Sequence, residues 1–176
     1  NLETLFELTC RYMDVPRSRV ELFVFDDEEP RHPGIWEDVK AGLYAASDKP
    51  ETVRVGVESS LLDDPVALVA TMAHELALVH LLGEGRIPVE TEDREPLADL
   101  LTVFLGMGIF GANSVVHESS WAAGHWSGWT VGRRGYLTMP MYGYAFALLA
   151  WARREPYPPW ATHLRLDVRA ALESSY

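Results

Sequence analysis

A long apolar segment, predicted to be a helix from Pro65 to Leu82, limits the folds open to this chain more than any other stretch. Asp63 or Asp64 can cap its start, and Gly83 ends it. A second apolar helix is predicted from Pro96 to Val115, with the preceding glutamate as its cap. A loop of about ten residues joins the two helices, so we expect them to pack side by side in antiparallel fashion.

The remainder of the chain predicts an α+β protein in which helices dominate. A helix over residues 1–13 precedes short strands over 20–25, 42–46 and 52–57, which form a small N-terminal sheet. The last third predicts a short strand over 128–131 and helices over 138–154 and 160–172. Because no linker, repeat or low-complexity segment interrupts the 176 residues, we expect a single domain over 1–176.

Composition narrows the classes of function. The chain carries 15 lysines and arginines against 26 aspartates and glutamates, which gives a net charge of −11. This acidic balance excludes nonspecific nucleic-acid binding, because such binding depends on basic side chains that neutralise phosphates. Cys10 is the only cysteine, which excludes an intrachain disulfide and a cysteine-based zinc site.

Two further features bear on the compartment. The chain begins at Asn1 without a basic and apolar leader, so we expect no targeting segment and a cytoplasmic location. The least polar stretch, from Leu100 to Val116, is short for a membrane span and contains three glycines. We therefore expect a buried helix there and no membrane span.

Ionisable residues inside the first apolar helix point to a functional site. His74 and Glu75 follow Met72 and Ala73, and burying such a pair costs on the order of several kcal/mol unless each group has a partner. Glu95 and Asp99 open the second helix four residues apart, so they share one face of it. If the four residues belong to one site, the side chains of His74 and Glu95 must converge.

This pattern of a His-Glu pair followed by Glu95-x-x-Ala98-Asp99 resembles the gluzincin zinc metallopeptidases, including the membrane-associated and minigluzincin peptidases. The wider run from Asp64 to Asn113 is similar to uncharacterised bacterial zincin-like proteins. The resemblance implies a zincin-like fold and a zinc-dependent hydrolase that acts on a peptide or protein. It also implies that His74 and Glu95 are metal ligands, that Glu75 is the general base, and that Asp99 orients a ligand from the second shell.

One position departs from the His-Glu-x-x-His motif, because Leu78 stands where the second ligand histidine belongs. His80 cannot replace it on a regular helix, since it lies about 120° around the axis from His74. Two protein ligands fall short of the three that a catalytic zinc site keeps, so we expect zinc binding to be weak or absent. The sequence leaves two alternatives: a metallopeptidase-type hydrolase with a third ligand from elsewhere or a replaced histidine, and a non-catalytic pseudo-enzyme that serves as a binding or scaffold module.

Overall fold

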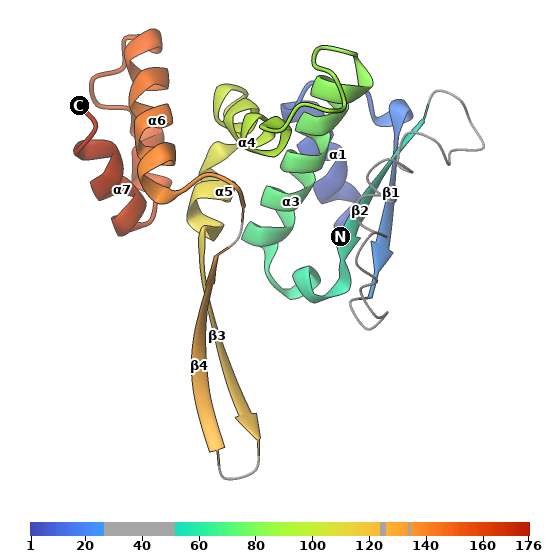
Figure 1. Cartoon of the computed structure of the whole chain (residues 1–176), viewed down its shortest axis with the longest axis horizontal. Helices are drawn as coiled ribbons and strands as arrows, with labels where there is room; N and C mark the ends of the chain where they lie inside the picture. The colour runs from blue at the N-terminus through green and yellow to red at the C-terminus, as the bar shows by residue number, and fades with distance from the viewer. Residues whose placement is uncertain (27–51, 124–125, 134) are drawn as a thin grey trace. The chain divides into compact units, whose positions relative to one another are not determined.

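The structure, a computed structural model, describes residues 1–26, 52–123, 126–133 and 135–176 (Figure 1). The chain forms two compact units, residues 1–98 and 99–176, and each is described by itself. Helices dominate and the strands pair in two small sheets, which confirms the α+β class. The strand expected over 42–46 lies outside the described residues.

The first unit combines helices with a two-stranded sheet. Its elements are α1 (Leu2–Tyr12), η1 (Arg17–Arg19), β1 (Val20–Phe25), β2 (Val53–Glu58), η2 (Ser59–Asp63), α3 (Pro65–Leu78) and the turn η3 (Val79–Gly83). Strands β1 and β2 are parallel, with Val20 opposite Val53 and Phe25 opposite Glu58. The predicted first helix and the strands predicted over 20–25 and 52–57 are confirmed to within a residue or so.

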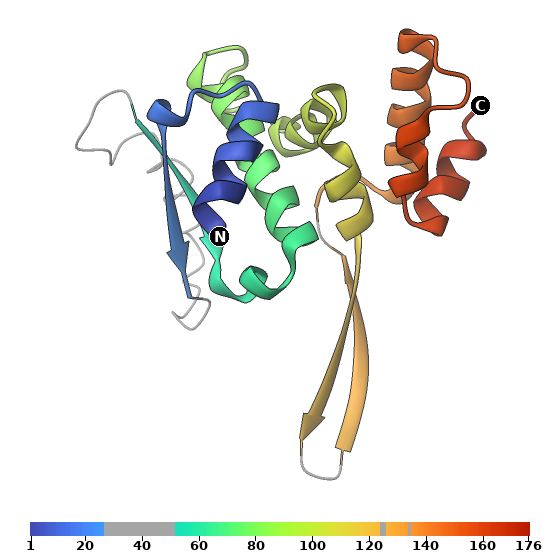
Figure 2. The same cartoon turned by 180° about the vertical axis from the view of Figure 1, so that it is seen from behind.

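Helix α3 lies beside both α1 and β2, and the core of this unit forms where they meet (Figure 2). Phe6 of α1, Val57 of β2, and Met72 and Leu76 of α3 are fully buried there. The start of α3 follows the sequence signals, since the Asp64 side chain accepts a hydrogen bond from the Ala67 N–H and Pro65 is the first helical residue.

The end of α3 differs from the prediction. The helical path does reach Gly83, but residues Val79–Gly83 form a π-helical turn, in which hydrogen bonds join residues five apart instead of four. The apolar run over 65–82 is continuous in composition, and nothing in its periodicity marks the change at Leu78.

The helix from Pro65 through Gly83 also has the length and apolar composition that a membrane crossing requires, and it is the one such helix in the described part of the chain. Its most apolar window is 56% buried inside the protein. A core helix passes the same test of length and composition, so the result is weak evidence for a span.

The second apolar helix is shorter than predicted. Helix α4 (Arg94–Phe104) begins two residues early, with Glu95 inside its first turn, and a separate helix α5 (Gly108–Ser114) follows it. Gly106 adopts φ +90°, and the N–H groups of Gly106 and Met107 bond back to the carbonyls of Val103 and Thr102 at 3.1 and 2.8 Å. This pattern ends a helix, so the prediction of one helix from Pro96 to Val115 is wrong.

The second unit continues α4 from Asp99 and adds a hairpin and a helical pair. Its further elements are α5, β3 (Val116–Ala123), β4 (Trp126–Arg133), α6 (Met139–Arg153), η4 (Pro159–His163) and α7 (Leu166–Glu173). Strands β3 and β4 are antiparallel, with Val116 opposite Arg133 and Ala123 opposite Trp126. The strand predicted over 128–131 lies within β4, whereas β3 was not predicted. The closing helix predicted over 160–172 is wrong, because extended residues at 164–165 divide it into η4 and α7.

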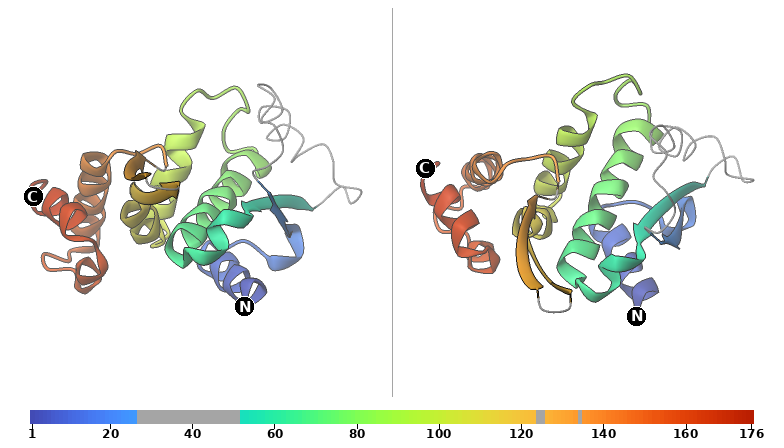
Figure 3. Two further views of the ribbon diagram at one scale, coloured as in Figure 1. Left: turned by 90° about the horizontal axis from the view of Figure 1, so that it is seen from below. Right: turned by 60° about the horizontal axis from the view of Figure 1, so that its bottom comes forward.

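Helix α6 matches its prediction and packs against α7 (Figure 3). The Thr138 hydroxyl accepts from the Met141 N–H and so caps the helix. Tyr142 and Phe146 are buried in the core of this unit, and Phe146 contacts the Trp160 ring at 5.3 Å. A side chain at Gly143 would come within 2.6 Å of the Ala171 carbonyl, so the close approach of α6 and α7 requires glycine there.

Candidate functional site

The side chains of His74 and Glu95 meet, as the sequence predicts. His74 Nε2 lies 2.9 Å from Glu95 Oε2, and the two side chains are only 13% and 11% exposed. Helix α3 supplies the histidine and the first turn of α4 supplies the glutamate, which follows it by 21 positions in the sequence. The prediction that these two groups converge is confirmed.

The Glu95 carboxylate has a nitrogen-bearing side chain beside each of its oxygens. Oε2 faces His74, and Oε1 lies 3.5 Å from Nε of Arg94, the preceding residue. An ionised carboxylate can only accept hydrogen bonds, so His74 Nε2 is the donor in this pair. The carboxylate therefore has two polar partners within the protein itself.

Glu75 and Leu78, the other two motif positions, lie on the same helix as His74. Glu75 is partly exposed and follows His74 by about 100° around the helix axis. Leu78 is the last residue of α3 and is buried. A leucine side chain has no atom that can coordinate a metal, and its burial shows that the position is filled with apolar packing.

A zinc ion requires more donors than these residues provide. In the described part of the chain, no group of three or more His, Cys, Asp or Glu side chains is arranged to hold a metal. A tetrahedral ion with bonds of about 2.1 Å separates two ligand atoms by roughly 3.4 Å. The 2.9 Å contact of His74 and Glu95 would have to open by only about 0.5 Å to match this spacing. The pair thus has suitable geometry for two ligands, but the set does not fit a catalytic zinc site.

Asp99, the predicted second-shell residue, lies one turn after Glu95 on α4 and is buried. Its Oδ2 accepts hydrogen bonds from the backbone N–H groups of Tyr136 and Leu137, at 2.8 and 3.1 Å. These bonds anchor the segment that leads into α6. Bonds from backbone donors to a buried carboxylate are among the stronger protein hydrogen bonds.

Tyr142 also interacts with Asp99 through its hydroxyl group. Burial, reinforced by the charge and hydrogen bonding of Asp99, raises the pKa of the Tyr142 phenol far above its ordinary range. The hydroxyl also lies where a side chain at Gly111 would be, because a Cβ built there would come within 2.6 Å of it. Tyr142 is therefore a neutral hydrogen-bond donor at any physiological pH.

His80 does not join His74 but has partners of its own. Its Nε2 lies 2.7 Å from the Met13 carbonyl at the end of α1, and its Nδ1 lies 3.1 Å from Glu84 Oε1. Burial raises the pKa of the Glu84 carboxyl, but hydrogen bonds from His80 and Arg86 outweigh this and hold it below its usual range. His80 thus ties the end of α1 to the π-helical turn.

Sequence reasoning missed Arg94, the backbone partners of Asp99, and Tyr142. Arg94 gives no spacing signal, because side chains one residue apart on a helix do not ordinarily face each other. The contacts of Asp99 with the backbone of Tyr136 and Leu137 leave no signature in the sequence, because any residue except proline supplies the N–H. Comparisons with protein-family models, with curated proteins and with solved structures find no match to this chain.

Proposed function

We propose that this chain is a zincin-like protein of the metallopeptidase type, whose hydrolytic site has lost one ligand at Leu78. One observation supports the proposal most strongly: His74 and Glu95, which the gluzincin pattern pairs, come together at 2.9 Å from two different helices. In this proposal the two residues are the retained metal ligands, Glu75 is the general base, and Asp99 stabilises the surroundings. The substrate class would be a peptide or protein.

The test restores the missing donor. Leu78→His places an imidazole four residues after His74, within the regular α-helical part of α3. Zinc content and zinc titration are compared for the unmodified protein and this variant. We expect stoichiometric zinc only after the substitution. Val66→His is the matched control, because it adds the same side chain to an exposed position about three turns before Leu78 on α3.

Activity is measured on the same proteins with a peptide library. The Leu78→His protein should cleave peptides, and the Leu78→His/Glu75→Gln protein should keep its zinc but lose this cleavage. That result would support the metallopeptidase proposal. Tight zinc in the unmodified protein would reveal a ligand that the proposal does not include. Equal zinc binding by the Leu78 and Val66 variants would contradict the proposed site.

A second candidate function is a pseudo-enzyme that binds a protein partner without cleaving it. The observation that favours it is the contact of Glu95 with His74 and Arg94, which pairs the carboxylate with two side chains in the absence of a metal. In this case Glu75→Gln should leave partner binding unchanged. A folded Leu78→His variant that binds no zinc and cleaves no peptide would favour this second candidate.

A further inference from the structure

Helix α6 is apolar on two faces, which is unusual for a helix at a protein surface. Residues 139–152 contain no charged side chain, and the first charge is Arg153, the last residue of the helix. One face, with Tyr142 and Phe146, is buried in the core of the second unit. The intramolecular packing of that unit therefore leaves part of the apolar surface of α6 exposed.

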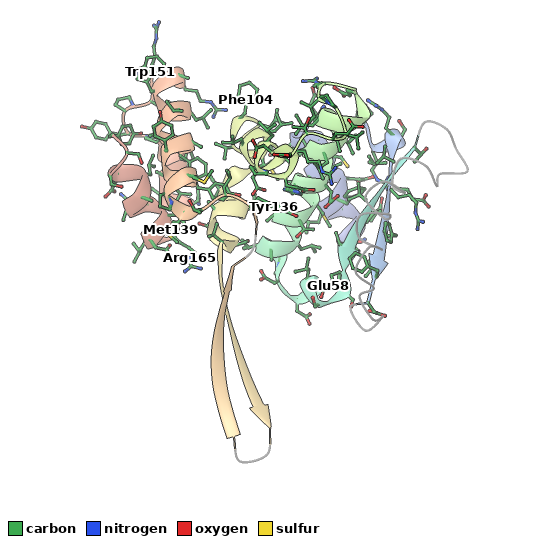
Figure 4. All side chains as sticks on the ribbon, in the orientation of Figure 1. Glu58, Phe104, Tyr136, Met139, Trp151 and Arg165 are labelled. Atoms are coloured by element: carbon green, nitrogen blue, oxygen red, sulfur yellow. The ribbon has the colours of Figure 1, made fainter. Side chains whose placement is uncertain are left out.

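The other face carries an exposed row of four large side chains, which we call the α6 stripe: Met141, Tyr144, Leu148 and Trp151. Their spacing of three, four and three residues keeps them on one side of the helix over about 15 Å. Trp151, labelled near the end of α6 in Figure 4, is 78% exposed. A continuous row of this kind marks an interaction site more often than scattered apolar residues do.

The distribution of charge indicates which partner fits the stripe. Residues 1–98 contain 21 acidic against 9 basic side chains, whereas residues 99–176 contain 5 against 6. A contact made by the second unit alone joins two units of nearly neutral charge, so charge repulsion within that contact is small. An anionic membrane would instead have to attract a chain of net charge −11.

We propose that the α6 stripe is the interface of a homodimer, in which the α6 helices of two copies pack antiparallel about a twofold axis. In this arrangement Trp151 lies against the partner's Met141, and Leu148 lies against the partner's Tyr144. Sulfur–aromatic contacts favour the first of these pairs. A parallel arrangement would bring the two Arg153 side chains together, whereas the antiparallel one keeps them at opposite ends.

The size of the stripe sets the expected strength of the dimer. Four large apolar side chains exposed to this degree offer on the order of 500 Å² per copy, or roughly 1,000 Å² in total. This is the lower end of specific interfaces, so we expect dissociation in the range of tens to hundreds of micromolar. The dimer should therefore form at high protein concentration and dissociate on dilution.

Sedimentation equilibrium of the full chain tests the proposal over a hundredfold range of concentration, up to about 0.5 mM. The mass should rise from 19.8 kDa toward twice that value. Leu148→Glu, in the centre of the stripe, should raise the dissociation constant at least tenfold, and Trp151→Ser should do the same. Tyr157→Glu is the matched control, because it adds the same charge at a 92% exposed position outside the stripe.

Salt gives a second, independent readout. Added sodium chloride screens the repulsion between two chains of charge −11, so the dimer should tighten as the ionic strength rises. A monomeric mass at every concentration, equal effects of Leu148→Glu and Tyr157→Glu, or dissociation by salt would each overturn the proposal. So would a monomer that sediments with phosphatidylcholine or phosphatidylserine vesicles, because the stripe would then contact lipid. Circular dichroism of each variant verifies that it is folded.

Discussion

Replacing His74 and Glu95 by alanine, singly and together, measures how strongly the two side chains of the candidate site are coupled. Their atoms are 2.9 Å apart and both side chains are almost buried, so water screens the interaction little. A hydrogen bond to a charged group contributes about 1.5–3 kcal/mol to stability. After His74→Ala, the Glu95 carboxylate loses this neighbour, while Arg94, which is 3.5 Å away and more exposed, stays beside it.

These values allow the free energies of the double-mutant cycle, which compares the two single substitutions with the double one, to be predicted. We expect each single substitution to lower the free energy of unfolding by about 2.5 kcal/mol, and the double substitution to lower it by about 3.5 kcal/mol. The coupling energy of the pair is then about 1.5 kcal/mol. Removing both side chains costs less than the sum of the two single costs, because the second change no longer separates a group from its partner in the pair.

Urea denaturation followed by circular dichroism at neutral pH provides the four free energies. Arg17 and Glu3 form a control pair in the same unit, on the surface, where a coupling below about 0.5 kcal/mol is expected. Free energies for the His74 and Glu95 substitutions that add to within about 0.4 kcal/mol would refute the reasoning, since independent residues behave in that way.

Three further predictions concern groups outside that pair. Asp99→Asn keeps an oxygen for the two backbone donors and should lower the free energy of unfolding by about 1 kcal/mol, whereas Asp99→Ala leaves the buried Leu137 N–H without its acceptor and should lower it by about 3 kcal/mol. Urea denaturation measures both values, and equal values would contradict the anchoring role of Asp99. The pKa of Glu84 is lower in the folded than in the unfolded protein, so the stabilisation from this carboxylate is present above the unfolded-state pKa and is lost as the pH falls through the folded-state pKa. Glu84→Gln should therefore make the melting temperature less sensitive to acid. A melting temperature with the same pH profile in both proteins would contradict this role of Glu84. Burial raises the pKa of Cys10 to about 11, so iodoacetamide should leave the folded protein unmodified at mildly alkaline pH and label it in urea, as mass spectrometry can show; rapid labelling of the folded protein would contradict the burial.

The helices that were predicted correctly are those whose ends carry local signals. Asp64 caps α3 and Thr138 caps α6, each through a hydrogen bond to a residue three positions later, so a short window of sequence is sufficient. The break between α4 and α5 was missed because a glycine within an apolar run is compatible with a continuous helix. Only its left-handed conformation, at Gly106, distinguishes an end from an interior position.

In the candidate site, too, local sequence signals were sufficient for some contacts and not for others. The pairing of His74 with Glu95 could be predicted because helical spacing and a short loop bring two motif residues together. The contact of Asp99 with the Tyr136 N–H and that of His80 with the Met13 carbonyl could not, because these backbone groups lie 37 and 67 residues away. Long-range contacts with main-chain atoms are independent of the partner's side chain, so no pattern of residue types indicates them.

The π-helical turn at Val79–Gly83 affects how many residues of sequence separate the two members of the candidate site. A turn with hydrogen bonds between residues five apart holds about one residue more than an α-helical turn. The interval of 21 residues from His74 to Glu95 contains this turn. We expect a deletion of one residue within the turn to preserve the His74–Glu95 contact and to abolish the His80–Met13 bond, which nuclear magnetic resonance of the two imidazoles can distinguish. In a homologous protein without the turn, the counterpart of Glu95 would lie 20 residues after the histidine, and a motif search with fixed spacing would overlook it.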